Sequence, residues 1–369
     1  MNERPEHNIF DPDKIPCREI SDPRALIKEP VVSVNMITYN HESYIAQAIE
    51  GVLQQETSFP FELVIGEDCS TDGTREIVFD YQKKYPDIIR IITSDQNVGM
   101  RKNGLRTTRA CRWKYIAFCE GDDYWHHPLK LQKQVDFLEA NPDYGMVHSD
   151  YDNLINKTGQ IIKSVHQYYN IRIPTDNLCE ELLINNFIGT LTVCARTKLI
   201  KQVDIGNSGS QEGRLIGDRP LWMEISRHSK IGYIDESLAV YRTLEESASN
   251  SSNRRKRLDF LKSSYNIRFH FIEKYGCSEK TRNIVLRKYH KMILRYSFLL
   301  MDKKNARNSF GFLQTVECNK KERAMNYCRY FGSRNRLNWL IIRSLMVARK
   351  LLHERLCPTL RGDPKVVDN

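Results

Sequence analysis

The word CEGDDYW at residues 119–125 carries the clearest chemical signal in the sequence. It places Asp122 and Asp123 side by side at the end of an apolar run, 114–120. Two adjacent carboxylates repel one another unless a cation lies between them. Mg²⁺ and Mn²⁺ accept such oxygen ligands and keep part of their coordination sphere for substrate phosphates. Taken alone, the word predicts a metal site and a solvated turn with an acidic helix cap equally well.

Polar side chains also follow earlier apolar runs, which favours the metal site. Tyr39 and Asn40 come directly after the run 31–38, and Asp68 and Ser70 follow the run 61–66. We interpret these runs as buried strands and the amphipathic segments between them as helices. In an open parallel sheet, ligands bind at the carboxyl ends of the strands. Two acidic strand ends on that edge are hard to explain as helix caps alone.

The order of the elements indicates a doubly wound α/β sheet, because strands and helices alternate with short loops. Residues 153–180 look irregular, and 208–218 form a loop rich in glycine and serine. Helical periodicity runs from 254 to about 356. We expect strands at 31–38, 61–66, 88–94, 114–120 and 144–152, paired strands within 230–243, helices at 41–55, 71–86, 100–111, 127–142 and 220–229, and helix, strand and helix within 179–203.

Length and charge divide the chain into two parts. The 369 residues suit one large domain or two ordinary ones. Residues 253–369 hold 28 basic and 9 acidic side chains, a net charge of +19, which leaves −9 for residues 1–252. An acidic half is a poor nucleic-acid binder, so we expect no nucleic-acid partner. The sequence shows no membrane-spanning run, no signal-peptide pattern and no paired-cysteine zinc motif, so we expect a cytoplasmic protein.

Three words in a fixed order connect these observations to a known family. VSVNMITYN, EDCSTDGT and CEGDDYW together resemble the motifs of the family 2 glycosyltransferases, which have the GT-A fold. The resemblance implies a Rossmann-like, mostly parallel α/β sheet flanked by helices, and an inverting hexosyltransferase. It implies a GT-A domain at 31–246 with a nucleotide-sugar half at 31–152 and an acceptor half at 153–246. From the composition, charge and periodicity we expect a polar leader at 1–30 and a helical basic region at 254–360.

The resemblance also implies roles for individual residues. Asp68 would read the nucleobase, Asp123 is the firmer ligand for Mn²⁺ or Mg²⁺, and Asp122 would contact both ribose and metal. Glu120 stands where the family more often has Asp. Arg101 could reach the diphosphate, although a surface position at a helix start explains it equally well. The residues implied to hold the nucleotide-sugar are Thr38, Tyr39, Asn40, Asp68, Ser70, Arg101 and Asp122.

Transfer with inversion also needs a base that takes the proton of the acceptor hydroxyl, while the metal offsets charge on the leaving phosphate. The resemblance assigns this base to an Asp just before a helix, where RLIGDRPLW has Asp218. A helix cap is the alternative for Asp218, and Glu212 is the second candidate base. Asp150 is a weaker candidate for holding an acceptor hydroxyl. Leu244 stands where many relatives have a His, so we expect no His ligand there.

The segment 335–356 combines apolar and basic side chains with Trp339. Two interpretations stay open, a helix in the interfacial layer of an anionic membrane and an ordinary packing helix. The first suits an enzyme that extends a glycan or lipid-linked acceptor at the inner leaflet, in cell-surface polysaccharide synthesis. Two other functions stay open as well. One is a nucleotidyltransferase, although TYNHESY replaces a Gly-rich phosphate loop, and the other is a non-catalytic binding module with a basic tail.

Overall fold

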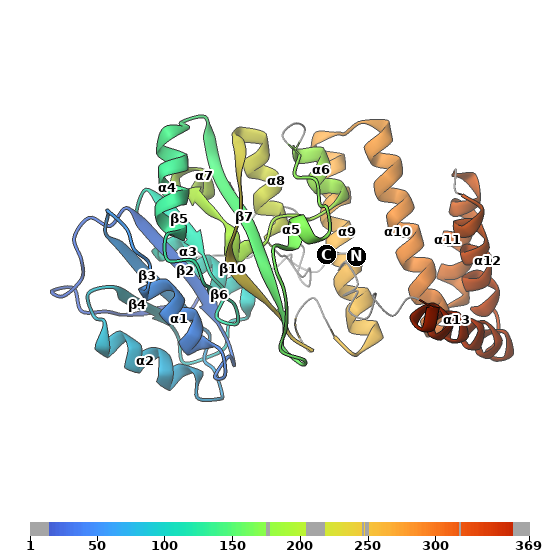
Figure 1. Cartoon of the computed structure of the whole chain (residues 1–369), viewed down its shortest axis with the longest axis horizontal. Helices are drawn as coiled ribbons and strands as arrows, with labels where there is room; N and C mark the ends of the chain where they lie inside the picture. Colours follow the sequence, from blue (N-terminus) through green and yellow to red (C-terminus); the bar gives the residue numbers. More distant parts are fainter. Residues whose placement is uncertain are drawn as a thin grey trace, which may run out of the picture. The chain divides into compact units, whose positions relative to one another are not determined.

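The computed structural model describes residues 15–174, 178–203, 218–245, 247, 251–316 and 319–356, with side chains up to Met346. The chain divides into two compact units (Figure 1). The first is an α/β unit that ends at Leu244 and leaves out residues 183–186. The second is helical and contains residues 183–186 and those from Glu245 onward.

Four parallel strands form the centre of the α/β unit: β2 (Val32–Thr38), β3 (Phe61–Glu67), β4 (Ile89–Thr93) and β5 (Tyr115–Phe118). Nearly all their residues are buried. A strand covered on both faces reads as a continuous apolar run, which is why the sequence predicts these strands correctly.

Within the described residues, the sheet has ten strands in the order β1-β4-β3-β2-β5-β9-β7-β10-β6, with β8 paired to β7. In the described part of the chain, β2, β3, β4, β5, β7 and β10 run in one direction. The predicted mostly parallel α/β fold is therefore confirmed. The further strands are β6 (Tyr124–Trp125), β7 (Tyr144–Ile155), β8 (Gln160–Ile162), β9 (Cys194–Arg196) and β10 (Lys230–Thr243).

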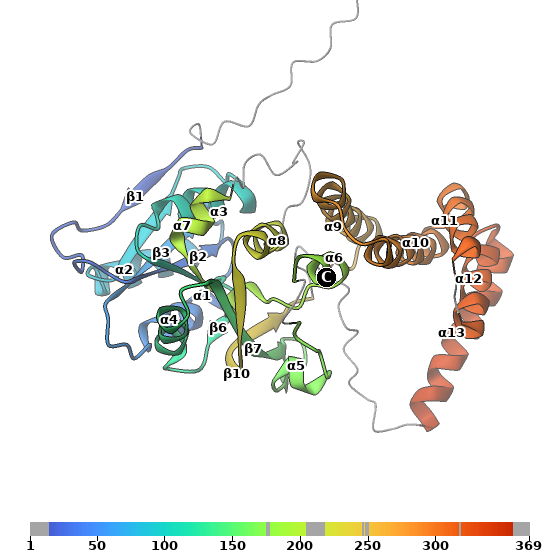
Figure 2. The same ribbon diagram turned by 90° about the horizontal axis from the view of Figure 1, so that it is seen from above.

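Helices cover both faces of the sheet. In Figure 2, α3 (Met100–Ala110), α7 (Thr197–Gln202) and α8 (Arg219–His228) lie on one side, and α1 (Ile45–Leu53) and α4 (Lys130–Ala140) on the other. The chain runs outward from β2 through β3, α2 (Thr74–Lys84) and β4, then returns to β5 on the other side of β2. This reversal between β2 and β5 is where doubly wound sheets bind ligands.

The described part of the expected polar leader contains a short strand. Arg18–Ile20 forms β1, an edge strand that pairs antiparallel with β4. An ion-pair network holds it, because the buried guanidinium of Arg90 on β4 binds Glu19 at 2.9 Å and Glu62 at 3.1 Å. A three-residue strand with exposed side chains gives no periodic signal, so only these tertiary ion pairs define it.

Two further expectations need correction. Residues 153–180 are not irregular throughout, because β7 continues to Ile155 and is followed by β8, α5 (Val165–Tyr168) and the start of α6 (Leu178–Ile184). Residues 230–243 form one long strand, β10, rather than two paired strands. Its register against β7 shifts between Ile234 and Ser237, so the polar residues in between form a bulge where a turn was expected.

The second unit consists of helices, as the sequence predicts. Side chains of Asn253, Ser278, Asp302 and Asn319 cap the first four by accepting hydrogen bonds from backbone N–H groups. No helix among the described residues is long and apolar enough to cross a membrane. The helices are α9 (Arg254–Tyr275), α10 (Glu279–Leu300), α11 (Lys303–Thr315), α12 (Lys320–Gly332) and α13 (Arg336–Leu356).

The Arg90 network yields the first prediction. Arg90→Leu leaves the 2% exposed carboxylate of Glu62 without its close counter-charge, so the variant should lose about 3–5 kcal/mol in free energy of unfolding. Urea unfolding followed by tryptophan fluorescence measures the loss. Lys83→Ala, which breaks an exposed ion pair with Asp80, is the control and should change stability by less than about 1 kcal/mol. Equal losses in the two variants would contradict the proposed role of Arg90.

Candidate functional site

The chain segments that follow β2 and β5 lie in direct contact. The backbone N–H of Gly121 donates to the carbonyl of Ile37 at 3.0 Å. A Cβ atom at residue 121 would lie 2.7 Å from Oγ1 of Thr38, so any larger residue would push the two segments apart. Glycine at this position therefore lets two predicted binding segments lie together at the point where the strand order reverses. These are the nucleotide-binding segment VSVNMITYN and the metal-binding segment CEGDDYW, which we call the metal word.

The segments after β2 and β3 are joined by hydrogen bonds. The N–H of Asn40 donates to Oγ of Ser70 at 3.1 Å, and the N–H of Thr71 donates to Oδ1 of Asn40 at 2.8 Å. Asn40 has a φ of 55°, a left-handed conformation that Asn tolerates better than most residues. The structure thus brings Asn40 and Ser70 together, while the ring of Tyr39 is 42% exposed and accessible to a ligand.

Asp68 is buried and holds the turn that precedes α3. Its carboxylate accepts hydrogen bonds from the N–H groups of Val98 and Gly99, both at 2.9 Å, and lies 3.5 Å from Arg106. Burial raises the pKa of Asp68, and these hydrogen bonds oppose the change. Arg101, in the first turn of α3, is partly buried, and burial lowers the pKa of its guanidinium. The nucleotide-binding roles of Asp68 and Arg101 stay predictions.

The two adjacent carboxylates after β5 differ in environment. Asp122 is partly buried, whereas Asp123 is 3% exposed and its Oδ1 accepts a hydrogen bond from the N–H of Arg242 at 2.7 Å. Burial, with the nearby charges of Asp122 and Glu120, raises the pKa of Asp123 well above its usual range. Asp122 therefore presents the more accessible carboxylate, although the sequence favours Asp123 as the firmer ligand.

Glu120, Asp122 and Asp123 present carboxylate oxygens, the kind of donor that Mg²⁺ and Mn²⁺ bind. Burial raises the pKa of Glu120 to about 8, and the charges of Asp218 and Asp122 add to the effect. Oε2 of Glu120 is buried without a hydrogen-bond partner. No three His, Cys, Asp or Glu side chains among the described residues form a complete metal cage. Mg²⁺ commonly binds through one or two carboxylates and substrate phosphates, and Mn²⁺ prefers the same oxygen ligands.

Asp218 reaches this cluster from a different part of the sequence. It immediately precedes α8, and its side chain makes no capping hydrogen bond, which disfavours the helix-cap alternative. Its Oδ2 instead accepts a hydrogen bond from Oγ1 of Thr190. Burial raises the pKa of Asp218, as expected for a carboxylate enclosed by protein. Glu212, the second candidate base, lies outside the described residues.

The side chain of Asp150 is enclosed by the protein and hydrogen-bonded to the backbone. It is fully buried, and its Oδ1 accepts hydrogen bonds from the N–H groups of Tyr151 at 2.7 Å and His166 at 2.9 Å. The carboxylate therefore fixes the start of α5 against β7, which favours a structural role for Asp150 over its predicted role of holding an acceptor hydroxyl. The buried ring of His148 lies beside it, 6.2 Å from the ring of His166.

Sequence reasoning missed three residues at this site. Arg106 binds Asp68, Thr190 binds Asp218, and the backbone of Arg242 binds Asp123. Each partner is 28 or more positions away in the sequence, so no local pattern connects the pairs. The sequence gives one indication that Arg242 has a special role, because it is a charged residue at the end of the otherwise mostly apolar strand LAVYR.

The comparisons with known proteins agree with this geometry. Residues 33–201 match the sequence model of Glycosyl transferase family 2. The match covers just under half of the chain, so we assign the family to this region. The resemblance inferred from the three sequence words is thereby confirmed.

Two relatives and one solved structure illustrate the likeness. An uncharacterised protein of Mycobacterium tuberculosis is 44% identical over 112 residues, which cover 30% of this chain and only 32% of that protein. The putative teichuronic acid biosynthesis glycosyltransferase TuaG of Bacillus subtilis is 27% identical over 68% of this chain and 93% of its own length. The mannosyltransferase PcManGT from Pyrobaculum calidifontis, in complex with GDP-Man and Mn²⁺, has a TM-score of 0.52 at 15% identity and 90% coverage of both chains, which shows the shared GT-A fold.

The burial of His148 leads to the second prediction. Burial lowers the pKa of His148 from 6.5 to about 3, so the unfolded chain binds a proton below pH 6.5 that the folded chain does not bind. The stability that this group contributes is present above pH 6.5 and is lost as the pH falls from 6.5 towards 3, by about 1.4 kcal/mol per pH unit. His148→Leu should therefore remove about 2 kcal/mol of the stability difference between pH 7 and pH 5.

Urea unfolding at both pH values measures this difference. His228→Gln, at an exposed position on α8, is the control and should leave the difference as it is in the parent protein. A His148→Leu protein that loses as much stability on acidification as the parent would exclude His148 as a cause.

Proposed function

We propose that the protein is an inverting, metal-dependent glycosyltransferase that moves a sugar from a nucleotide-sugar to a hydroxyl of a glycan or lipid-linked acceptor. The observation that supports this most directly is that Asp218 lies near enough to Glu120, a residue within the family 2 match, for its charge to raise the pKa of Glu120 together with that of Asp122. Carboxylates from two distant segments would then supply both a base and metal ligands at one place. Cell-surface polysaccharide synthesis is the proposed context, in keeping with the name of TuaG.

The donor would bind across the ends of β2, β3 and β5. The exposed ring of Tyr39 can stack on the nucleobase, beside Asn40 and Ser70. Arg101 lies in the first turn of α3, where backbone N–H groups and a guanidinium favour a diphosphate. Asp122 and Asp123 would hold Mn²⁺ or Mg²⁺, which when bound offsets the negative charge on the leaving diphosphate.

Asp218 would act as the general base. The acceptor oxygen attacks the anomeric carbon and forms the new glycosidic bond, while the bond from that carbon to the phosphate oxygen breaks. The hydroxyl proton passes to a carboxylate oxygen of Asp218, and the nucleoside diphosphate leaves with the bonding electron pair. The raised pKa of Asp218 strengthens it as a proton acceptor, and the hydroxyl of Thr190 holds its other oxygen in place.

The two alternative functions predict different behaviour. A nucleotidyltransferase would form or cleave a phosphoanhydride bond and release pyrophosphate, and a binding module would release nothing. The segment that follows β2, residues 39–44, has no glycine to form a phosphate-binding loop, which argues against the first alternative.

The third prediction tests this function directly. With Mn²⁺ and a panel of nucleotide-sugars, the protein should release a nucleoside diphosphate from at least one donor in the presence of acceptor glycans. Asp218→Asn should lower kcat by about 10²–10⁴-fold, because general base catalysis is lost while the shape is kept. Asp122→Asn should raise the Mn²⁺ concentration needed for half-maximal rate.

Asp143→Asn is the matched control, since Asp143 pairs with Lys230 at the protein surface, 2.6 Å away. It should have the parent rate. Full activity in Asp218→Asn would rule out Asp218 as the base, and release of pyrophosphate instead of a diphosphate would favour the nucleotidyltransferase.

We also propose that the second unit attaches the protein to the inner face of the cytoplasmic membrane. On α13, Leu337, Ile341 and Leu345 are 67%, 50% and 62% exposed and form one stripe at a spacing of four residues. Trp339 belongs to another face of the helix, with its ring 6.3 Å from that of Phe298. The helix therefore has an exposed apolar stripe in addition to a packed one.

Charge favours an anionic lipid surface as the partner of this stripe. Lys320, Lys321, Arg334, Arg336 and Arg343 on and beside α12 and α13 are exposed. Glu322, the acidic residue of this described stretch, is bound by Arg287 and Lys291. A second copy of the same surface would bring like charges together, whereas anionic headgroups would neutralise them while the acyl region receives the apolar stripe.

The fourth prediction concerns this stripe. The full-length protein should co-sediment with vesicles that contain phosphatidylglycerol and much less with pure phosphatidylcholine vesicles. The triple variant L337S/I341S/L345S should lose most of this binding, because apolar burial drives insertion of the stripe. A matched variant, L340S, at one exposed position beside the stripe, should lose less. Undiminished binding by the triple variant would refute the proposal, and self-association that the triple variant abolishes would point to a second copy instead.

A further inference from the structure

Arg242, the penultimate residue of β10, makes two hydrogen bonds to the metal word that no sequence pattern predicts. It is 7% exposed, and its backbone N–H donates to Oδ1 of Asp123 at 2.7 Å. Its Nε donates to the carbonyl oxygen of Asp122 at 2.9 Å. One residue therefore binds a side chain and a peptide oxygen of the two adjacent aspartates, 119 and 120 positions away in the sequence.

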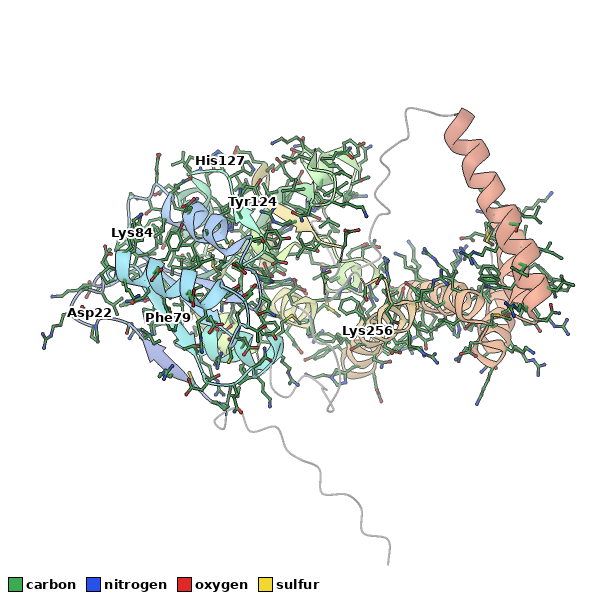
Figure 3. The ribbon with its side chains drawn as sticks, turned by 90° about the horizontal axis from the view of Figure 1, so that it is seen from below. Asp22, Phe79, Lys84, Tyr124, His127 and Lys256 are labelled. Carbon is green, nitrogen blue, oxygen red and sulfur yellow. The ribbon has the colours of Figure 1, made fainter. Side chains whose placement is uncertain are left out.

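The rest of the guanidinium ties this contact to two other elements. Nη2 donates to Oε1 of Gln47 on α1 at 2.7 Å, and Nη1 donates to Oδ1 of Asn156 beyond β7 at 3.3 Å. The planar group also lies near two aromatic rings, 4.7 Å from the ring centre of Tyr44 and 5.5 Å from that of Tyr124 (Tyr124 is labelled in Figure 3). Because the guanidinium is rigid and planar, these several partners together fix its orientation.

We propose that Arg242 is a positioning residue that fixes the metal word, so that the carboxylate of Asp122 faces the metal and the donor diphosphate. The proposal rests on the proposed function and goes beyond it, since Arg242 would touch neither substrate nor metal. Holding the Asp122 peptide by its oxygen and the Asp123 carboxylate by a backbone N–H leaves the Asp122 side chain as the freer ligand.

The surrounding charges explain why such a clamp is needed. Glu120, Asp122 and Asp123 are consecutive acids apart from Gly121, and their mutual repulsion would push the segment open. The cationic guanidinium of Arg242 reduces this repulsion and also closes the turn mechanically. A lysine would keep the charge but could not hold the Asp122 carbonyl, Gln47 and Asn156 together, because it lacks the planar fork.

The test measures metal binding instead of turnover. Titration of the full-length protein with Mn²⁺, alone and with UDP or GDP, followed by electron paramagnetic resonance of free Mn²⁺, gives the dissociation constant. Arg242→Gln should weaken Mn²⁺ binding by about 10–100-fold, the usual effect of losing an outer partner of metal ligands. Arg242→Lys should not restore it. Gln47→Ala, which removes one acceptor of the guanidinium and keeps Arg242, should give a smaller loss in the same direction.

Arg196→Gln is the matched control. Arg196 on β9 also binds peptide oxygens, those of Leu138 at 2.5 Å and Tyr144 at 2.9 Å, and its guanidinium lies 5.5 Å from the ring centre of Tyr115. Its loss should lower the melting temperature without changing the Mn²⁺ dissociation constant of the folded protein. Thermal melts of all variants separate a loss of folding from a loss of positioning.

The outcomes distinguish this inference from the proposed function. A parent protein that binds no Mn²⁺ with any nucleotide would contradict the metal-dependent function itself. A parent protein that binds Mn²⁺, together with folded Arg242→Gln and Gln47→Ala variants that bind it equally well, would overturn the role of Arg242 alone. If Arg242→Gln does not fold, a parent-like dissociation constant in Gln47→Ala would overturn the role too.

Discussion

Mutual repulsion between carboxylates is the constraint around which this α/β unit is arranged. Glu120, Asp123 and Asp218 all have raised pKa values, and burial is the first cause in each case. Grouping buried acids is unfavourable unless the fold compensates for it. The compensation comes from fixed donors, the N–H of Arg242 and the hydroxyl of Thr190. What remains uncompensated, such as the buried Oε2 of Glu120, suits a site that is completed by a cation and phosphates.

The sheet topology explains how these groups come together. Because β3, β2 and β5 are parallel neighbours in the sheet, the segments that follow them lie at one edge. Gly121 allows the segments after β2 and β5 to touch. Parallel strands alone would leave the other side of the β5 end open. The antiparallel β9 and the long β7–β10 pair extend the sheet beyond β5, and with them come Thr190, Asp218 and Arg242. The predicted nucleotide-sugar half and the predicted acceptor half thus meet where β9 pairs with β5.

The central strands and the metal word could be predicted from the sequence because their signals are local. A strand buried on both faces is a continuous apolar run, and polar residues at its end stand out. Other features depend on contacts between distant residues. The edge strand β1 needs Arg90, and β10 looked interrupted because the polar bulge between Ile234 and Ser237 resembles a turn. Thr190 and Arg242 carry no local mark, since their partners lie 28 and 119 positions away.

Adjacency in sequence also conceals a difference that only the fold creates. Asp122 and Asp123 are chemically identical neighbours, and nothing local decides which of them should bind a metal. The backbone of Asp123 turns back to bond the carbonyl of Glu120 at 3.1 Å, which directs its side chain inward to the N–H of Arg242. Asp122, at the outside of that turn, keeps its carboxylate partly exposed. The end of β10 therefore gives two chemically equivalent acids different environments, because it binds Asp123 and leaves Asp122 the more accessible carboxylate, and this difference depends on a strand more than 100 residues further along the chain.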